Sequence, residues 1–317
     1  MSLLTIDDVQ SAWDVIVGKL PRTPVITSEV LGNILDVRLF FKAELFQKTG
    51  SFKVRGALNK LNSLTPQEKA VGVIAFSAGN HAAGLAYAAA LSGIQATIVM
   101  PEHASQSKVE ATRRYGGHVI LHGGPRDLFP KVQELQREHG YTLIHPFDDP
   151  FTIAGQGTVA LELLEDVRKP DVVIVPIGGG GLISGMSVVI KALHPSTKVI
   201  GVEPVGAAGM RRALDAGAVV PLEKVETIAD GLGAPFAGQL NLEHVQQLVD
   251  DVVLLTDDEI AAGLRLQMER TKLMAEPAGA AAFAALLHRK FPVAPGATVV
   301  CIVSGGNVDL NKLKAIL

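Results

Sequence analysis

Four consecutive glycines, Gly178 to Gly181, separate an apolar run at residues 172–177 from an apolar stretch at residues 182–193. The first run is typical of a buried strand, and the second of a helix. Because glycine has no β-carbon, successive N–H groups in such a loop can turn toward an anion, and the positive end of the following helix points to the same place. A tight turn without a ligand is the alternative, although four glycines give more freedom than a turn needs. The pattern therefore predicts a strand, an anion-binding loop and a helix, with a phosphate group as the expected ligand.

Short apolar strands alternate with helical stretches along most of the chain. With 48% hydrophobic but only 5% aromatic residues, the core must be aliphatic. The alternation predicts an α/β fold with parallel sheets wrapped by helices, in two blocks at roughly 70–145 and 150–317. The clearest strands are residues 37–41, 73–76, 96–100, 118–121, 172–177, 198–202 and 298–303, and helices are expected at 81–91, 107–115, 128–138 and 158–166.

The charge pattern favours an enzyme that acts on a small molecule. The net charge is −3, and neither sign forms a long block, so we expect no nucleic-acid partner and no membrane partner. The apolar window at 172–190 is broken by Pro176 and five glycines, which argues against a spanning helix. The N-terminus has no basic segment followed by an apolar one, and the single Cys301 lies in an apolar run. These features predict a cytoplasmic protein with a buried thiol.

A dinucleotide is the first candidate ligand, because Glu203 ends the strand after the glycine loop, where an acidic residue can hold a ribose. The glycine spacing does not support it. A G-x-G-x-x-G pattern needs glycine at 183 or 184, where the chain has Ile183 and Ser184, and there is no P-loop motif. A nicotinamide-dependent dehydrogenase therefore stays only as an alternative from another class.

Three further segments are expected to meet the glycine loop. Lys53 lies in a polar loop that enters a helix starting near Ser51, although a lone lysine is more often solvated. Residues 76–81 leave a strand and open another helix, whose free N–H groups could hold a carboxylate. Residues 304–307 follow the last apolar strand. Three loops at strand ends together with one lysine predict a binding site.

Six segments in this order resemble the fold-type II pyridoxal-phosphate enzymes, and within them the threonine dehydratase and serine racemase group. They are residues 51–57, 77–81, 153–158, 176–182, 229–231 and 304–307. The resemblance covers nearly the whole chain. It implies a tryptophan-synthase β-like fold with a large cofactor-binding domain at 1–68 and 149–317 and a small mobile domain at 69–148.

The resemblance also implies the cofactor, pyridoxal 5'-phosphate, and the residues that hold it. Lys53 would form the Schiff base and then act as the catalytic base, which requires a lowered pKa. Gly178 to Gly181 would bind the phosphate, Asn80 would face the ring hydroxyl, and Ser304 would face the ring nitrogen. The full cofactor-binding set is Phe52, Lys53, Asn80, Gly178, Gly179, Gly180, Gly181, Leu182, Gly231 and Ser304.

The implied reaction is β-elimination of a 3-hydroxy amino acid, with L-threonine or L-serine expected, to a 2-oxo acid and ammonia. The substrate-binding set is Ser77, Ala78, Gly79, Asn80 and His81, although His81 is equally well explained as a structural histidine. Serine racemases of this group have a serine at the position of Ala78. Since alanine cannot exchange protons, we expect a dehydratase, an L-threonine/L-serine ammonia-lyase, with little racemisation.

Several alternatives stay open at this point. Within the family they are a 3-hydroxyaspartate ammonia-lyase and a serine racemase, and a silent binding protein on the same fold is a further one. For a divalent cation the group pattern needs a glutamate, matched by Glu203, and an aspartate six residues on, where this chain has Gly209. The sequence therefore leaves the metal site unknown, with a divalent or monovalent cation undecided, and the expected assembly is a homodimer or a higher homo-oligomer.

Overall fold

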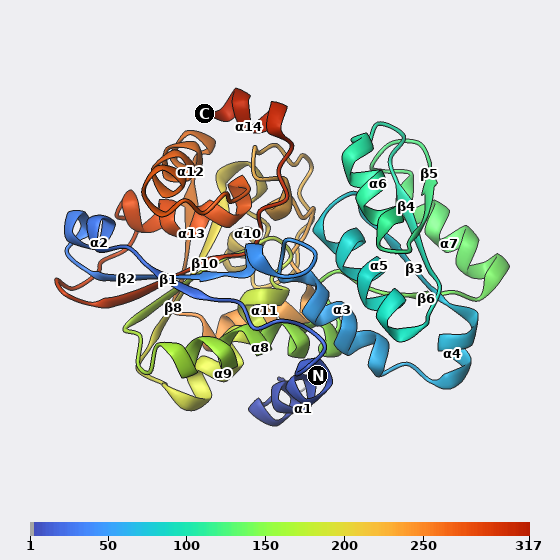
Figure 1. Ribbon diagram of the computed structural model, residues 1–317, viewed down its shortest axis with the longest axis horizontal. Helices are drawn as coiled ribbons and strands as arrows, with labels where there is room; N and C mark the ends of the chain where they lie inside the picture. Colours follow the sequence, from blue (N-terminus) through green and yellow to red (C-terminus); the bar gives the residue numbers. More distant parts are fainter. Residues whose placement is uncertain (1–2) are drawn as a thin grey trace.

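The computed structural model describes residues 3–317, in which two β-sheets are each surrounded by helices (Figure 1). In this part of the chain the larger sheet has the order β1-β2-β10-β7-β8-β9 and the smaller one β5-β4-β3-β6. All neighbouring strands are parallel except β1 and β2. The large sheet comprises β1 (Val25–Thr27), β2 (Arg38–Ala43), β7 (Val172–Pro176), β8 (Lys198–Pro204), β9 (Asp251–Leu255) and β10 (Thr298–Val303). The small sheet comprises β3 (Val73–Phe76), β4 (Ala96–Met100), β5 (His118–Leu121) and β6 (Thr142–Leu143).

This architecture confirms the predicted α/β class with mostly parallel sheets. Every expected strand is present within one or two residues of its predicted bounds. The strands that were not expected are β1, β6 and β9, of which the first two are only two or three residues long.

The strands of the large sheet are apolar on both faces because helices cover both. Successive side chains of a strand point to opposite faces. On β7, Ile174 joins the core that contains Phe283 of α13, whereas Val173 and Val175 join the core that contains Ile183 of α9. Near-continuous apolar runs are the sequence signature of strands in this situation.

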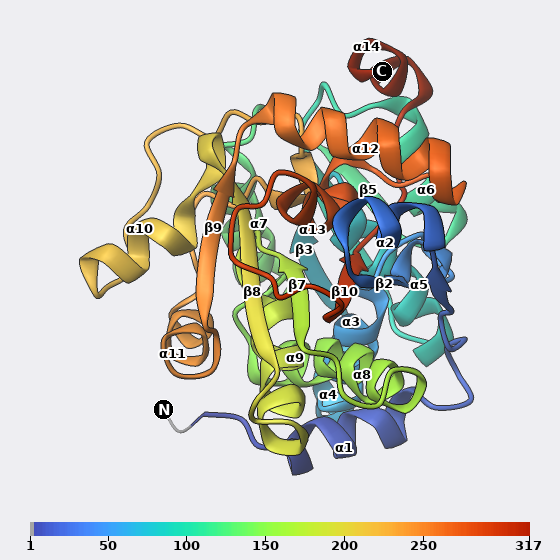
Figure 2. The same cartoon turned by 90° about the vertical axis from the view of Figure 1, so that its left-hand side faces the viewer.

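Different helices cover the two faces of the large sheet, and Figure 2 shows them on opposite sides of it. Each face has its own hydrophobic core, and the two cores contain residues of different helices. One face carries α2 (Glu29–Leu35), α12 (Asp257–Thr271), α13 (Pro277–Leu287) and α14 (Leu310–Ile316). The other carries α1 (Ile6–Ile16), α8 (Pro150–Asp166), α9 (Gly181–Leu193), α10 (Gly209–Ala216) and α11 (Gln239–Leu248).

The small sheet is covered in the same way. Its covering helices are α5 (Asn80–Ser92), α6 (Gln106–Arg114) and α7 (Leu128–His139), whereas α4 (Pro66–Val71) leads into β3 and has no buried residue. Leu85 of α5 packs on one face, and Val132 of α7 packs on the other. All four strands of this sheet lie within residues 69–148, and those of the large sheet lie outside that range.

Helix α3 (Lys53–Asn62) joins the two halves of the molecule. It packs against α5 beside the small sheet and against α8 beside the large one, and Figure 1 shows it between them. Its first residue is the predicted catalytic lysine, so the fold itself places Lys53 where the two halves meet.

Two smaller expectations concern the apolar segments. Among residues 3–317, no helix combines the length and the apolarity that crossing a bilayer requires. Cys301 is fully buried on β10, as expected, and burial raises the pKa of its thiol.

Candidate active site

The four glycines form the loop between β7 and α9, and close packing explains why two of them must be glycine. A β-carbon at Gly179 would lie 2.3 Å from the ring of Phe147, and one at Gly180 would lie 2.7 Å from Cβ of Asn241. Gly180 also has a φ of 102°, in the region that favours glycine. Protein atoms therefore fill the space that side chains would need.

The same packing turns the backbone of the loop. Asn241 donates from Nδ2 to the carbonyl oxygen of Gly179, and the N–H of Gly238 donates to it as well, both at 3.0 Å. In a trans peptide the next N–H, that of Gly180, points the opposite way. Within residues 3–317, the N–H groups of Gly178, Gly179 and Gly180 donate to no other backbone group. Unpartnered N–H groups at the N-terminus of α9 are the donors that a phosphate requires.

Leu182 is the second residue of α9, and its side chain is buried in the apolar core beneath the large sheet. Its side chain therefore cannot reach a ligand, and only its backbone N–H faces the same end of the helix as the glycine loop.

Lys53 opens α3, and its amine is held by a carbonyl group. Nζ donates to the carbonyl oxygen of Pro146 at 2.9 Å and lies 5.2 Å from the centre of the Phe52 ring. Removal from water lowers the pKa of Lys53 to about 8, although the charge of Glu276 opposes this shift. An amine with such a pKa has a neutral fraction near neutral pH, as a base requires.

Ser304 lies beside the start of α3, directly after β10. Its carbonyl oxygen accepts from the N–H of Phe52 at 3.2 Å, and a β-bridge pairs Ser51 with Gly305. The Ser304 hydroxyl is buried and lies 3.5 Å from the carbonyl oxygen of Ala278, which is the long limit of a hydrogen bond. It is therefore available to a ligand.

Asn80 and Gly231 meet on the other side of this loop. Nδ2 of Asn80 donates to Oε1 of Glu276 at 2.6 Å, and Oδ1 accepts from Nδ2 of Asn307 at 2.8 Å. A β-carbon at Gly231 would lie 3.9 Å from Nδ2 of Asn80, and one at Gly178 would lie 3.2 Å from the carbonyl oxygen of Gly231. Gly231 thus links the Asn80 cluster to the glycine loop.

The structure therefore brings the predicted cofactor residues into one connected cluster of loops. The loop at 146–147 completes it, since Pro146 binds Lys53 and Phe147 covers Gly179. The elements come from both sheets, which explains why the residues are scattered over the chain.

The expected substrate loop leaves β3 and opens α5. The N–H of Gly79 donates to Oγ of Ser77 at 3.2 Å, and Gly79 is the N-cap of α5 without a side-chain cap. Backbone N–H groups at this helix start are therefore free for a carboxylate. Ala78 is half-buried beside the apolar core of the small sheet.

The side chain of His81 has a structural role. It is buried, and Nε2 lies 3.0 Å from the carbonyl oxygen of Ile144. Burial lowers its pKa to about 3, with the charge of Lys53 as a further cause. A neutral imidazole that donates to Ile144 ties α5 to the segment after β6. This geometry favours a structural role for the His81 side chain. Only the backbone N–H of His81, at the start of α5, is left for a substrate.

The side chain of Glu203 also has a structural role. Its two carboxylate oxygens accept from the N–H groups of Met210 and Arg211, both at 2.8 Å, so it caps α10. Burial raises its pKa to about 7. Both oxygens are engaged, which does not support a ribose contact. In residues 3–317 no three His, Cys, Asp or Glu side chains gather as metal ligands would.

A buried ionic network anchors α3 behind the site. Arg55 binds Glu44 at 2.8 Å and Glu162 at 2.7 Å, and Lys42 binds Glu162 at 2.6 Å. All four side chains are at most 2% exposed. Two cations and two anions compensate one another here, which is the condition for burying charge.

The motif at 153–158 lies inside α8 and serves packing. The predicted helix at 158–166 therefore starts too late, since α8 begins at Pro150. A β-carbon at Gly155 would lie 2.7 Å from the backbone of Gly56, so α8 and α3 approach backbone to backbone. This close approach fixes the helix that carries Lys53.

Glu276, Pro146, Phe147 and Asn241 were not anticipated from the sequence. Only Glu276 left a signal, because it is acidic within an apolar stretch at 273–287, and a lone buried carboxylate is rare.

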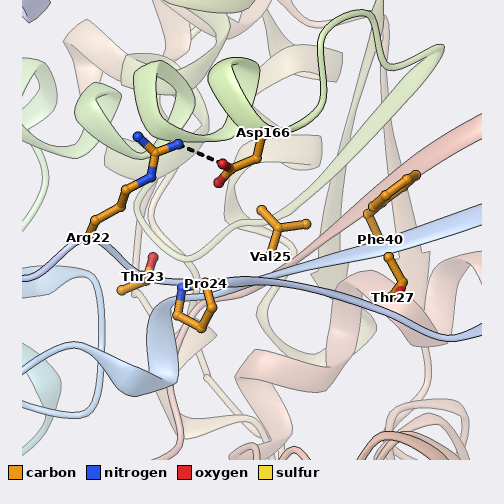
Figure 3. Close-up of a pocket in the computed structure, with 7 residues that line it drawn as sticks. All are labelled: Arg22, Thr23, Pro24, Val25, Thr27, Phe40 and Asp166. Atoms are coloured by element: carbon orange, nitrogen blue, oxygen red, sulfur yellow. Dashed lines mark hydrogen bonds and ion pairs between the residues drawn. The ribbon is translucent and has the colours of Figure 1, made fainter.

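A hollow of about 430 Å³ lies elsewhere, at the edge strand β1 (Figure 3). Arg22 reaches across it to Asp166 at 2.7 Å, with Val25 and Phe40 on its wall. None of its lining residues belongs to the loops described above, so it is separate from the candidate active site.

Comparison with known proteins agrees with this geometry. The chain matches the family model for pyridoxal-phosphate dependent enzymes over residues 18–305, and it belongs to that family. It is 43% identical to the catabolic L-threonine dehydratase TdcB of Escherichia coli, with 99% of this chain and 96% of that protein covered. It is 42% identical to the L-threonine ammonia-lyase of Thermotoga maritima, over 99% of this chain and 78% of that protein. The structure of maize serine racemase aligns with a TM-score of 0.94 at 42% identity, covering 99% of this chain and 97% of that one.

Proposed function

We propose that this protein is a pyridoxal-phosphate-dependent ammonia-lyase that dehydrates L-threonine and L-serine. The observation that carries the proposal is the position of Lys53. Its desolvated amine and the unpartnered N–H groups of the glycine loop are joined through Pro146 and Phe147. The names of the relatives in Escherichia coli and Thermotoga maritima support the substrate class.

The residues present fit pyridoxal phosphate. The N–H groups of Gly178 to Gly181 and of Leu182 would hold the phosphate, which requires the small residues and the free donors found there. Asn80 and Ser304 would contact the ring oxygen and the ring nitrogen, with Phe52 and Gly231 beside them. Bound pyridoxal phosphate would supply an electron sink for the electrons left on the α-carbon when its proton is removed.

Lys53 would take the α-proton of the substrate, because its amine has a pKa of about 8 and therefore a neutral fraction near neutral pH. The free N–H groups between Ala78 and His81 would hold the substrate carboxylate and so orient the α-proton toward Lys53. The hydroxyl of Ser304 has too high a pKa to protonate a ring nitrogen. A serine in place of an acidic residue at the ring nitrogen favours prompt loss of a β-hydroxyl group, so that L-threonine yields a 2-oxo acid and ammonia.

A serine racemase is the second candidate function, favoured by the structural similarity to the maize enzyme. Ala78 argues against it, since a methyl group returns no proton on the second face of the substrate. A 3-hydroxyaspartate ammonia-lyase is a third candidate, because Lys108 of α6 lies within electrostatic range of the site at Glu276.

We also propose a cytoplasmic homodimer or higher homo-oligomer whose small domain, residues 69–148, moves relative to residues 1–68 and 149–317. Support for the motion comes from the two sheets, which share no strand and lie in separate parts of the chain. Small-angle scattering with and without substrate tests the motion, and light scattering after gel filtration tests the assembly.

The test of the function is a substrate panel scored by ammonia release. L-threonine and L-serine should be turned over faster than either diastereomer of 3-hydroxyaspartate. The purified protein should be yellow, and borohydride should bleach it and fix the cofactor on Lys53. A colourless protein that binds NAD overturns the proposal, whereas a yellow protein without turnover favours a silent binder.

A further inference from the structure

Glu276 is a buried carboxylate that neither the family motifs nor the reaction outlined above uses. It is the N-cap residue of α13, yet its side chain caps no N–H group of that helix. The backbone N–H of Glu276 donates to the carbonyl oxygen of Gly305 at 3.1 Å, which fixes its Cα beside the Ser304 loop. Only 8% of the residue is exposed.

The carboxylate points into the space bordered by two glycines. A β-carbon at Gly305 would lie 2.6 Å from Oε1 of Glu276, and one at Gly231 would lie 3.4 Å from it. Both glycines belong to loops of the candidate site. The side chain of Glu276 is therefore accommodated by the absence of two other side chains.

Oε1 of Glu276 fixes the orientation of the Asn80 amide. It accepts one N–H of Asn80 at 2.6 Å, while Oδ1 of Asn80 accepts from Asn307, whose Nδ2 also donates to the carbonyl oxygen of Thr49 at 2.7 Å. An amide nitrogen has two N–H bonds, so one remains for a ligand. With both ends of the amide engaged, it cannot flip.

The charge of Glu276 also acts on the amine of Lys53 and raises its pKa. Burial raises the pKa of Glu276 itself to about 7, and the hydrogen bond from Asn80 opposes that shift. The other charged groups that act on it are Lys108 of α6, Asp230 at the start of the 3₁₀-helix η3 (Asp230–Leu232) and Lys312 of α14. Within the described residues no cation forms an ion pair with it.

We propose that Glu276 is a positioning residue of the active site: it aims the free N–H of Asn80 at the ring of the cofactor, and from this fixed position its charge acts on the amine of Lys53. This inference rests on the proposed function and deepens it, because it assigns a role to a residue outside the six motifs.

The test uses apo-protein reconstituted with pyridoxal phosphate, and it compares two variants of Glu276. Glu276→Gln retains an oxygen acceptor for Asn80 but removes the charge, whereas Glu276→Ala removes both. The control is Glu223→Ala, at an exposed position in the loop after α10. Cofactor affinity is measured by absorbance titration. We expect Glu276→Ala to weaken the affinity at least about fivefold, because a hydrogen bond to a charged group contributes more free energy than a fivefold change in affinity. Glu276→Gln should stay within about threefold of the unsubstituted protein, because its amide oxygen still accepts the hydrogen bond of Asn80.

The charge is tested without any cofactor. Acetylation of Lys53 in the apo-protein, followed by mass spectrometry across pH, reports the pKa of its amine. Removing the negative charge should move the midpoint to lower pH in both Glu276 variants and leave it unchanged in the control. An unshifted midpoint in Glu276→Gln, or an unchanged cofactor affinity in Glu276→Ala, overturns the inference. Failure of the proposed function is a separate outcome: in that case the unsubstituted protein itself binds no pyridoxal phosphate or releases no ammonia.

Discussion

The ring of Phe147 covers Gly179 so closely that a β-carbon at Gly179 would lie 2.3 Å from it. Phe147 follows Pro146, the residue that accepts the hydrogen bond of Lys53. One segment of the chain thus shapes the glycine loop and also holds the lysine. The proposed phosphate site and the proposed base therefore depend on the same segment.

Substituting Gly179 should disrupt cofactor binding. In Gly179→Ala the ring of Phe147 must move, so we expect the affinity for pyridoxal phosphate, measured by absorbance titration, to fall at least about tenfold, which corresponds to about 1.4 kcal/mol. Gly178→Ala should have a smaller effect, since its nearest atom would be 3.2 Å away. Gly124→Ala, where the nearest atom is at 3.5 Å and lies outside the site, is the control. Equal affinities in Gly179→Ala and the control would contradict the expectation.

Lys53→Ala should abolish ammonia release and leave the fold intact, because the amine is the proposed base and only its tip makes a polar contact. We expect kcat to fall by at least about a thousandfold, within the range for loss of a general base. Circular dichroism checks the fold. Lys48→Ala, in the same loop with an exposed side chain, should retain activity. Residual turnover above about one per cent in Lys53→Ala would exclude the assigned role.

Ala78 should limit racemisation. With L-serine as substrate, pyruvate should form much faster than D-serine, and Ala78→Ser should raise the ratio of D-serine to pyruvate because a hydroxyl group can return a proton. Chiral chromatography of the reaction mixture measures both products. The idea fails if the unsubstituted protein forms D-serine as fast as pyruvate.

His81 should make the protein less stable in acid. The pKa of its imidazole is about 3 in the folded protein and about 6.5 when unfolded, so the unfolded chain binds more protons between these values. The stabilisation is complete above pH 6.5 and is lost as the pH falls toward 3, by about 2 kcal/mol between pH 7 and 5. Urea unfolding at both pH values should show a smaller loss in His81→Gln than in the unsubstituted protein. His139→Gln, at an exposed site on α7, should not change the loss.

Arg55 should contribute strongly to stability through its buried ion pairs. Arg55→Met leaves Glu44 and part of Glu162 uncompensated in the interior, so the free energy of unfolding should fall by about 3–5 kcal/mol. Arg22→Met removes ion pairs with Glu165 and Asp166 that are partly exposed and should cost at most about 1 kcal/mol. Urea titrations measure both, and similar losses would contradict the difference in burial.

Much of the fold could be predicted because local patterns were unambiguous. The apolar runs on β7 and β10 are short, bounded by turn residues and rich in β-branched residues, as buried parallel strands require. The predicted helix at 158–166 missed the first turns of α8, which begins at Pro150 and includes the glycines of the motif at 153–158. Gly155 and Gly157 lie where α8 touches α3 and α9, respectively, tertiary contacts that no local pattern reveals.

Two site residues illustrate the same limit. His81 belongs to a loop that resembles a substrate site, yet its side chain is used by the carbonyl group of Ile144, 63 residues along the chain. Glu203 resembles a ribose or metal ligand, yet it caps α10. Sequence spacing indicates that a residue lies at a strand end or a helix start, but it does not indicate which neighbouring group its side chain binds.

The sequence by itself determined the α/β class, the family and the glycine loop between a buried strand and a helix, because these depend on chemical type and spacing along the chain. Only the tertiary structure decided how Lys53 is held, why Gly179 must be glycine and where Glu276 lies. Those features depend on desolvation and on contacts between segments more than 90 residues apart, such as Lys53 with Pro146 and Asn80 with Glu276, which are set when both sheets pack around α3.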